Sequence, residues 1–162
     1  GTGSGCIPIA IKKSQADWSV IATDISDDAL SIAKENNALN KTEVIFYKDD
    51  LFNSTAFEPS QQFDIIISNP PYILEEEKAS LDKEVTGFEP ALALFCTSTT
   101  AMYGAIKILA EERLRINGSL YLELHEHHAQ EVGLLFKDPN WNVQVQEDYD
   151  GKERFLVAKK VK

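Results

Sequence analysis

The chain has 162 residues, 43% of them hydrophobic, and its 26 acidic and 16 basic residues give a formal net charge of −10. This length is enough to bury one core and indicates one domain, while the acidic balance disfavours unaided binding to a nucleic-acid backbone. No apolar run approaches the roughly eighteen residues of a membrane span, and no signal peptide opens the chain. We therefore expect a cytoplasmic protein with no membrane partner and no direct nucleic-acid partner.

The two cysteines, Cys6 and Cys96, lie far apart and match no metal-ligand spacing. They fit a reducing compartment better than a disulfide framework. We expect both to be small buried hydrophobic side chains.

The chain opens with a glycine-rich stretch, G-T-G-S-G, from Gly1 to Gly5. Turns of this kind normally connect a strand to a helix. Because no strand stands in front of it, we expect the first strand to be missing and the chain to be a domain fragment. No Lys-Ser/Thr pair follows, which excludes a P-loop, and a plain tight turn is an equally good reading of the glycines alone.

The first half of the chain then alternates helix and strand. Ser26 is a plausible N-cap, and Pro8 is tolerated in the first turn of a helix. The expected elements are a helix from Ile7 to Lys13, a strand from Trp18 to Asp24, a helix from Asp27 to Leu39 and a strand from Glu43 to Tyr47.

The next strand, Phe63 to Ser68, has an unbroken apolar run that predicts burial on both faces, as in a parallel sheet. A helix from Thr99 to Arg115 follows, closed by the C-terminal signal Asn117-Gly118. Its expected apolar side consists of Met102, Ile106, Leu109 and Leu114.

The chain ends with a strand (119–124), a helix (129–136) and two alternating segments (142–148 and 153–158) around Tyr149-Asp150-Gly151-Lys152. The Asp-Gly turn predicts an antiparallel hairpin there. Together the elements predict an α/β fold with a doubly wound, mostly parallel sheet and a C-terminal antiparallel hairpin, forming one domain over residues 1–162.

Acidic residues end two of the predicted strands, at the sheet edge where such folds bind ligands. Asp24 lies 19 residues after Gly5, close to the spacing of about 20 at which an acid accepts hydrogen bonds from ribose hydroxyls. Asp50 can accept from an adenine amino group, and Leu51 can cover the adenine ring. A turn role is nearly as good for Asp49, which we leave unassigned. These residues predict a nucleoside cofactor.

The segment N-P-P-Y, Asn69 to Tyr72, follows the strand that ends at Ser68. Pro70 and Pro71 lack an N–H, and X-Pro geometry keeps the backbone extended, so this corner offers carbonyl acceptors. The Asn69 amide oxygen adds another acceptor, and Tyr72 can stack on a planar group. Two rigid acceptors suit a carboxamide or an aromatic amine. The alternative is a Pro-Pro loop that merely ends the strand.

Such nitrogens are poor nucleophiles, and a carboxylate cannot deprotonate an amide. The productive strategy is to orient the nitrogen toward a strong electrophile so that the proton leaves after the bond forms. A sulfonium methyl donor meets this need.

These motifs resemble those of class I S-adenosyl-L-methionine-dependent methyltransferases acting on planar nitrogens. The segments E-V-T-G-F-E-P-A-L-A-L-F, L-Y-L-E-L and D-Y-D-G-K-E-R are similar to the HemK/PrmC family, whose members methylate the glutamine of the Gly-Gly-Gln motif in peptide chain release factors. The resemblance implies S-adenosyl-L-methionine as cofactor and a release factor as partner.

Carried onto this chain, the resemblance implies that Gly1, Thr2, Gly3, Ser4 and Gly5 line the methionine moiety. It implies that Asp24 binds the ribose and that Asp50, Leu51 and Asn69 contact the cofactor. It also implies that Asn69, Pro70, Pro71 and Tyr72 form the catalytic corner, and that Phe88, Glu89 and Pro90 shape the substrate side.

The chain departs from the family pattern in three places. We expect the N-terminal helical domain of the family to be missing. C-T-S-T-T stands where a Gly-rich Asp-Gly pair is usual, and His125, Glu126, His127 and His128 form an unusual cluster. We expect no metal there. Two other functions stay open: an N-methyltransferase acting on an exocyclic amine of DNA or RNA, and a non-catalytic fragment.

Overall fold

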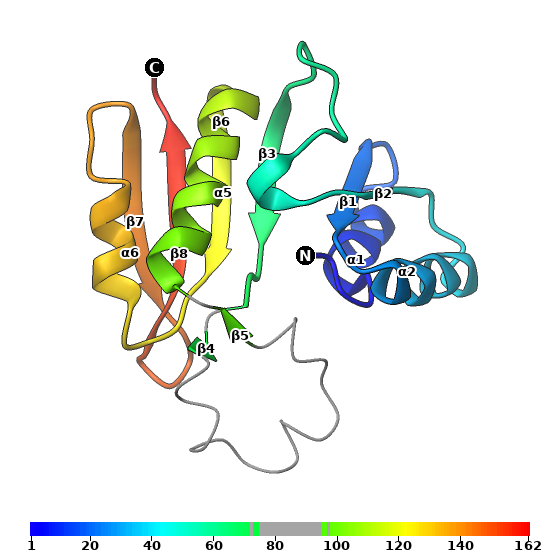
Figure 1. Ribbon diagram of the computed structural model, residues 1–162, viewed down its shortest axis with the longest axis horizontal. Coiled ribbons are helices and arrows are strands. Elements are labelled where there is room, and N and C mark those ends of the chain that lie inside the picture. The colour runs from blue at the N-terminus through cyan, green and yellow to red at the C-terminus, as the bar shows by residue number, and fades with distance from the viewer. Residues whose placement is uncertain (72, 75–94, 97) are drawn as a thin grey trace. The chain divides into compact units, whose positions relative to one another are not determined.

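The computed structural model describes residues 1–71, 73–74, 95–96 and 98–162 of the chain. The chain folds into two compact units, one formed by residues 1–59 and the other by residues 60–162 (Figure 1). The predictions for Tyr72, for Phe88, Glu89 and Pro90, and for most of the E-V-T-G-F-E-P-A-L-A-L-F segment fall outside the described residues.

The first unit is a two-stranded parallel sheet with two helices. Strand β1 (Val20–Asp24) pairs with β2 (Val44–Lys48) in the register Val20 to Val44 through Asp24 to Lys48. Helices α1 (Cys6–Ser14) and α2 (Asp27–Leu39) pack on these strands, and the 3-10 helix η1 (Leu51–Asn53) follows β2. Its small core contains Ile9, Ala22 and Val44.

Helix α2 begins and ends where its sequence predicts. The Ser26 side chain accepts the backbone N–H of Ala29 at 3.3 Å, which confirms it as the N-cap. Asp27 and Asp28 occupy the first turn, where the helix dipole favours negative charge. At the other end, the Asn37 Oδ1 accepts from the backbone N–H of Val44 at 3.2 Å and so ties the helix to β2.

The second unit is a four-stranded mixed sheet with two helices. Its strand order is β3-β6-β8-β7, formed by β3 (Phe63–Ser68), β6 (Leu114–Glu123), β8 (Glu153–Lys160) and β7 (Trp141–Glu147). Strands β3 and β6 are parallel, whereas β8 runs antiparallel to both of its neighbours. Helices α5 (Thr99–Arg113) and α6 (Ala129–Leu135) accompany the sheet, and β4 (Ile73–Leu74) pairs with β5 (Phe95–Cys96).

The core of this unit lies between the sheet and its helices. Its largest fully buried side chains are Tyr103, Phe136, Leu114, Leu120, Leu122, Leu124, Leu156 and Val132. Phe136 and Trp141 meet edge to face, with ring centroids 5.7 Å apart. Along β6 and β8, buried and more exposed side chains alternate, which matches the alternation of apolar and polar residues in their sequences.

The fold class is confirmed, with parallel strand pairs, helical connections and the predicted antiparallel hairpin of β7 and β8. The doubly wound sheet differs in one respect, because the described strands form separate hydrogen-bonded sheets rather than one continuous sheet.

The prediction that β3 is buried on both faces is wrong. Ile65 and Ile67 are 37% and 41% exposed. Among the described residues, β3 pairs only with β6 and therefore stands at the end of its sheet. An apolar run in the sequence shows that a strand is hydrophobic. How much of that strand is buried depends on what packs beside it.

The expected apolar side of α5 is also partly wrong. The buried positions of the helix are Thr99, Tyr103, Ile106 and Ala110, so only Ile106 agrees. Leu114 is buried as predicted, but it already belongs to β6. Tyr103 was not predicted to be buried, because its hydroxyl makes it polar and the prediction counted only apolar residues at helical spacing.

The pair Asn117-Gly118 does not close α5, because the helix ends at Arg113 and these residues lie within β6. Asn117 has φ 68°, a left-handed conformation, and the β3–β6 register shifts between Phe63 and Ile65. A Cβ on Gly118 would lie 2.9 Å from the Arg115 carbonyl oxygen and 3.0 Å from the Asp64 carbonyl oxygen. The pair therefore makes an irregularity inside the strand that no side chain larger than hydrogen fits.

The outermost strand of the four-stranded sheet is β7, which pairs only with β8 among the described residues. Its exposed positions include Asn142, Gln144 and Gln146, which carry no charge.

Cys6 is exposed at the start of α1, which corrects the prediction of a buried side chain. Its Sγ lies 3.3 Å from the Ser4 Oγ. The side chain of Cys96 lies outside the described part of the structure. None of the helices within the described residues is both long and apolar enough to cross a membrane.

Candidate functional site

The glycine-rich loop is hydrogen-bonded to the carboxyl end of β1. The backbone nitrogens of Gly1 and Thr2 each donate to the Thr23 carbonyl oxygen at 2.9 Å, and the Gly3 N–H donates to the Asp24 Oδ2 at 2.8 Å. The loop and the predicted ribose acid, far apart in sequence, are therefore in direct contact.

Asp24 is 7% exposed, and both of its carboxylate oxygens accept hydrogen bonds. Besides Gly3, the backbone N–H of Ser26 donates to its Oδ1 at 3.0 Å. A carboxylate offers about four acceptor positions, so two remain for a ligand. Spacing predicted the location of Asp24, but not that it also fixes the glycine loop and the start of α2.

Gly5 brings the loop close to α2. It has φ 80°, and a Cβ there would lie 3.1 Å from the Ala33 Cβ. From the same helix, the Asn36 Nδ2 donates to the Ser4 carbonyl oxygen at 2.9 Å. Glycine is needed at this position for both its backbone conformation and its contact.

The acids after β2 organise the segment that follows. Asp49 accepts from the Ser54 hydroxyl at 2.6 Å and from the backbone N–H groups of Thr55 and Ala56 at 2.9 and 3.2 Å. The Asp50 Oδ1 accepts the Phe52 N–H at 3.0 Å and caps η1. The turn role considered for Asp49 is thus observed.

Asp50 and Leu51 are both half-buried, and the adjacent Phe52 is 57% exposed. Since β1 and β2 are parallel, Asp24 and these residues follow the same edge of one sheet. This exposed aromatic ring next to the predicted adenine acceptor had been given no role from the sequence.

The residues of the first unit fit a nucleoside cofactor with a methionine tail. The Thr2 Oγ1 is buried and has no hydrogen-bond partner in the described part of the chain, an arrangement that a bound polar group would satisfy. The free acceptor positions of Asp24 suit vicinal hydroxyls, and the open space around the Gly3 Cα admits a ligand.

Asn69 begins the predicted acceptor corner at the carboxyl end of β3. It is exposed, and its side-chain amide has no hydrogen-bond partner within the residues that the structure describes. Pro70 is buried and Pro71 is half-buried, which anchors the corner. All peptide bonds described are trans.

The neighbouring end of β6 is held by three contacts. In the parallel β3–β6 register Ser68 faces Leu122, so Asn69 and Glu123 follow at the same edge. The hydroxyl of Tyr103 donates to the Glu123 carbonyl oxygen at 2.8 Å. The Leu124 N–H donates to the Arg154 carbonyl oxygen at 2.7 Å, and the Arg154 Nη1 donates back to the Leu124 carbonyl oxygen at 3.4 Å.

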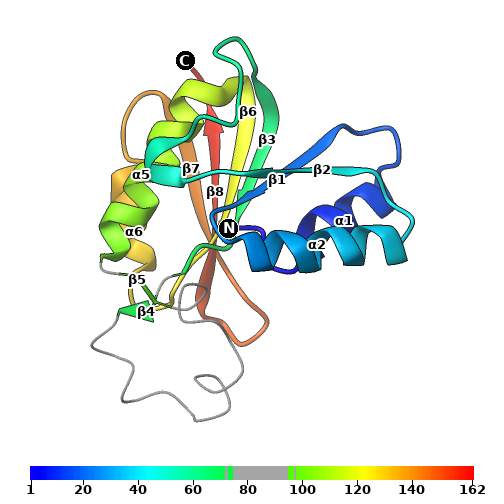
Figure 2. The same ribbon diagram turned by 45° about the vertical axis from the view of Figure 1, so that its right-hand side comes forward.

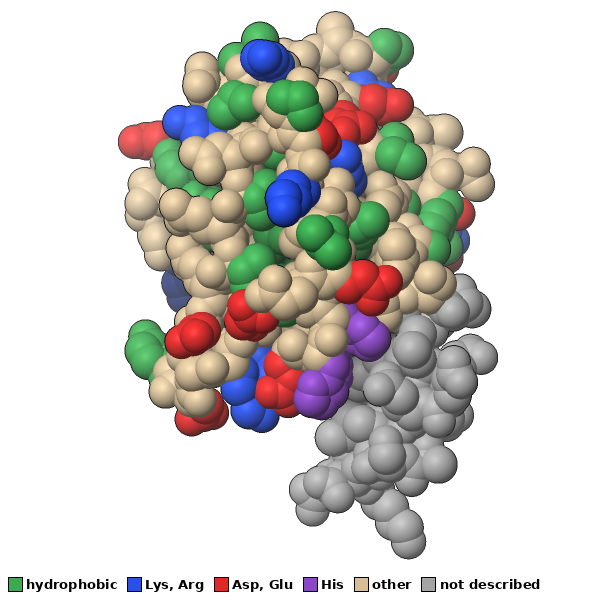
Figure 3. Space-filling model, turned by 90° about the vertical axis from the view of Figure 1, so that its left-hand side faces the viewer, with side chains coloured by type: hydrophobic (Ala, Val, Ile, Leu, Met, Phe, Trp, Pro, Cys, Tyr) green, Lys and Arg blue, Asp and Glu red, His purple; other side chains and the backbone are tan. Residues whose placement is uncertain are grey.

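The histidine cluster follows directly after β6, and histidines gather beside acidic and basic side chains at one end of this face of the protein (Figure 3). The His125 ring centroid lies 5.1 Å from that of His127 and 5.5 Å from that of His128. Among the described residues no group of histidine, cysteine or acidic side chains has a metal-binding arrangement.

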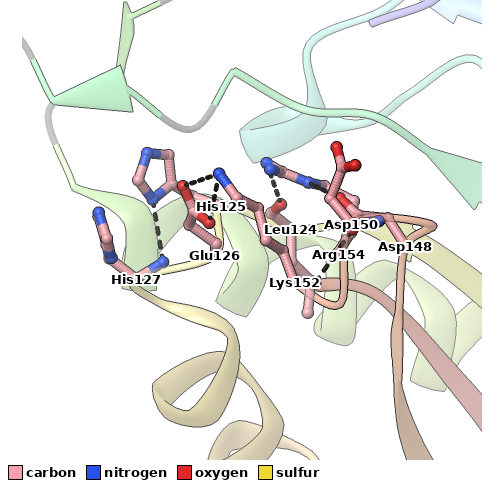
Figure 4. Close-up of polar contacts among 8 residues, drawn as sticks. All are labelled: Leu124, His125, Glu126, His127, Asp148, Asp150, Lys152 and Arg154. Carbon is pink, nitrogen blue, oxygen red and sulfur yellow. Dashed lines mark hydrogen bonds and ion pairs between the residues drawn. The ribbon is translucent and has the colours of Figure 1, made fainter.

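An ion pair connects Glu126 to the β7–β8 turn (Figure 4). The Lys152 Nζ lies 3.0 Å from Glu126, and this hydrogen bond lowers the pKa of Glu126. Within the turn, Asp148 accepts the Lys152 N–H at 3.0 Å and the Asp150 N–H at 2.9 Å, and its Oδ2 lies 3.3 Å from the Arg154 Nε. The Lys152 N–H makes the largest contribution to holding the pKa of Asp148 below its ordinary value of 3.8.

Comparison with known protein families places residues 1–87, more than half of the chain, in the methyltransferase small domain. The chain belongs to this methyltransferase family. The matched region includes the glycine loop, Asp24 and the N-P-P-Y segment. The methyltransferase prediction is thereby confirmed at the level of the family.

Proteins named release factor glutamine methyltransferase are similar over nearly all of this methyltransferase domain. The one from Bacteroides thetaiotaomicron is 38% identical over 161 residues, which is 98% of this chain and 58% of the relative. The one from Chlorobaculum tepidum is 40% identical over 159 residues, covering 96% of this chain and 54% of the relative. The chain thus spans somewhat more than half the length of these curated relatives.

Solved methyltransferase structures share the fold. A methyltransferase from Pyrococcus furiosus superimposes with a TM-score of 0.71 at 18% identity, covering all of this chain and 73% of that protein. The ribosomal protein L11 methylase of Lactobacillus delbrueckii gives a TM-score of 0.66 at 24% identity, covering all of this chain and 67% of that protein.

Proposed function

We propose that residues 1–162 form the catalytic domain of a methyltransferase. It transfers a methyl group from S-adenosyl-L-methionine to the side-chain amide nitrogen of the glutamine in the Gly-Gly-Gln motif of peptide chain release factors. The observation that carries this proposal is the Asn69 corner at the carboxyl end of β3. Its amide is exposed, has no hydrogen-bond partner among the described residues, and precedes a buried proline. The names of the relatives support the choice of substrate.

The acceptor corner holds a carboxamide by both of its hydrogens. The Asn69 Oδ1 accepts one N–H of the glutamine amide and the Pro70 carbonyl oxygen accepts the other. Pro71 contributes no donor and keeps the Pro70 carbonyl extended. Tyr72, which lies outside the described residues, is proposed to pack on the flat face of the amide. Because the nitrogen is oriented rather than deprotonated, its proton leaves to water only after the new N–C bond has formed.

S-adenosyl-L-methionine, when bound, supplies an electrophilic sulfonium methyl group. The cofactor would give up its methyl group to the nitrogen and leave as S-adenosyl-L-homocysteine, whose sulfur would keep the electron pair of the broken methyl–sulfur bond. Residues Gly1 to Gly5 cradle the methionine moiety, with Thr2 offering its orphan hydroxyl. Asp24 accepts from the ribose, while Asp50 and Leu51 face the adenine, next to Phe52.

Labelled S-adenosyl-L-methionine tests the proposal directly. The protein is incubated with a release factor, with an adenine-containing duplex, or with neither. Label on the Gly-Gly-Gln glutamine, located by mass spectrometry of tryptic peptides, supports the proposed reaction. A release factor whose Gly-Gly-Gln glutamine is replaced by alanine is the matched control and is expected to stay unlabelled.

The other outcomes decide against the proposal. Label on the duplex identifies an exocyclic-amine methyltransferase. No label, together with no heat of binding for S-adenosyl-L-homocysteine in calorimetry, identifies a non-catalytic fragment. The acidic net charge of −10 and the cytoplasmic chemistry of translation fit a protein substrate in the cytoplasm better than a nucleic acid.

A further inference from the structure

The turn between β7 and β8 lies at the end of the second unit's sheet where β3 and β6 end. Here the hairpin tip means residues 148–152. Strand β8 is antiparallel to β6, with Phe155 facing Glu123, so the tip extends past the end of β6. Because β3 ends at the same edge, the tip and the end of β3 lie at one end of the sheet, as Figures 1 and 2 show.

The hairpin tip is rigid. The Asp148 carboxylate binds two backbone N–H groups of the turn and contacts the Arg154 guanidinium. The Asp148 N–H donates to the Lys152 carbonyl oxygen at 2.8 Å, and the Gly151 N–H donates to the Asp148 carbonyl oxygen at 3.1 Å. The Lys152–Glu126 ion pair ties the tip to the segment after β6 (Figure 4). A turn closed by this many bonds restrains the backbone from which its side chains project.

Tyr149 is the side chain that this rigid turn presents. Its relative exposure is 109%, the largest among the exposed large hydrophobic residues described, so its side chain is fully open to solvent. A tyrosine on a fixed turn gains a large amphipathic contact area on binding and loses little side-chain entropy.

The charges around Tyr149 indicate the chemistry of a partner. Glu147 and Asp150 are exposed and take part in no ion pair among the described residues. The basic residues nearest Tyr149 are already neutralised, since Lys152 of the tip pairs with Glu126, and Arg154, just after the tip, pairs with Asp148. The free charge at the tip is therefore negative, which favours a cationic partner surface.

We propose that the hairpin tip docks the protein substrate outside the acceptor glutamine, with Tyr149 packing on the polypeptide and Glu147 and Asp150 attracting its basic side chains. This inference rests on the proposed function for the identity of the substrate. The tip adds binding energy and register for a folded protein, whereas a short Gly-Gly-Gln peptide reaches only the Asn69 corner.

The test compares Tyr149→Ala and Asp150→Lys with the unmodified protein. Ile116→Ala is the matched control, because Ile116 is 63% exposed and lies near the start of β6, at the opposite edge of the same sheet. The readouts are methyl-transfer kinetics with the release factor and with the peptide, and calorimetric binding of the release factor.

For the release factor, Tyr149→Ala is expected to raise KM and Kd about tenfold, the loss typical of an interface anchor, and to leave kcat within twofold. Asp150→Lys is expected to weaken binding by several-fold, with the loss shrinking as salt concentration rises. Peptide kinetics and the Ile116→Ala variant are expected to match the unmodified protein.

Unchanged KM and Kd in both variants, or an equal loss with the short peptide, would overturn the inference while leaving the proposed function standing. If the unmodified protein transfers no methyl group but binds the release factor through Tyr149, the proposed function fails and the docking surface stands. If the protein does not bind the release factor at all, both the proposed function and the docking surface are contradicted. Circular dichroism and urea midpoints establish that the variants are folded.

Discussion

The carboxylate of Asp24 and the backbone N–H of Gly3 are hydrogen-bonded at 2.8 Å, across 21 residues of sequence. The same carboxylate holds the Ser26 N–H at the entrance of α2. One side chain thus connects the glycine loop, the end of β1 and the start of a helix, and its acceptor groups set the shape of the proposed cofactor site.

Replacing Asp24 with asparagine keeps the size of the side chain but turns one acceptor into a donor, which faces a backbone N–H. We expect the free energy of unfolding to fall by about 1–3 kcal/mol and the Kd for S-adenosyl-L-homocysteine to rise at least tenfold. Urea denaturation and calorimetry measure the two effects. Asp28→Asn, on the exposed side of α2, is the control, and equal behaviour of the two variants would contradict the role given to Asp24.

Removing the Asn69 side chain is expected to separate catalysis from stability. Because this amide is exposed and has no hydrogen-bond partner in the described part of the chain, Asn69→Ala is expected to unfold at the same urea concentration as the unmodified protein. Its kcat is expected to drop by about 10²–10³-fold, as for the loss of one positioning hydrogen bond, with a far smaller change in cofactor affinity. Asn142→Ala, on strand β7, is the control. Near-normal turnover of Asn69→Ala would remove the amide-clamping mechanism.

Two glycines of the second unit are expected to respond oppositely to alanine. A Cβ on Gly118 would be 2.9 Å from a backbone oxygen, whereas a Cβ on Gly104, in α5, would meet nothing within 4 Å. Gly118→Ala is expected to destabilise the fold by about 1–3 kcal/mol, and Gly104→Ala to stabilise it by about 0.5–1 kcal/mol. Thermal and urea unfolding give both values, and a neutral Gly118→Ala would show that β6 relaxes at this point.

The pair of Lys107 and Asp138 predicts an acid-sensitive component of stability. Their charged atoms lie 2.7 Å apart, and the hydrogen bond from Lys107, with that from the Asn140 N–H, lowers the pKa of Asp138 below 3.8. A carboxyl whose pKa is lowered by folding stabilises the protein above its unfolded pKa and loses this contribution as the pH falls through the folded pKa.

We therefore expect unfolding free energy to decrease as the pH falls below about 4, and this decrease to be smaller in Asp138→Asn. Burial opposes the charge of Lys107, but its contacts with Asp138 and Glu111 outweigh that effect and raise its pKa above 10.5, so the lysine does not titrate in this range. Urea midpoints from pH 7 to 2.5 test the prediction, with exposed Asp17→Asn as the control. An unchanged acid limb in Asp138→Asn would assign the effect to other carboxyls.

Local signals in the sequence located several elements accurately. The capping residue Ser26 and the two acids after it placed the start of α2, and the bounds of β3 were predicted to the residue. The Asp150-Gly151 turn predicted the terminal hairpin, because Gly151 takes φ 76°. In each case the decisive interactions lie within a few residues along the chain.

Long-range contacts were the part that sequence could not supply. Asn117-Gly118 carries the signature of a helix end, yet its role follows from the approach of the Asp64 carbonyl on another strand. Tyr103 became a core residue because its hydroxyl reaches the Glu123 carbonyl. Spacing likewise located Asp24 but not its bond to Gly3. The predicted contacts of Asn69, Asp50 and Leu51 with cofactor stay predictions.

The outer strand β7 has a consequence for handling the protein in solution. Its exposed positions Asn142, Gln144 and Gln146 are uncharged, and its one exposed charged residue is Glu147 at the end of the strand. Natural sheet edges commonly carry a lysine or proline that discourages further strand pairing. We expect concentrated samples of the protein to associate through this edge strand and become turbid. A lysine at position 144, facing solvent, would act as a gatekeeper and prolong storage life without touching either proposed binding surface.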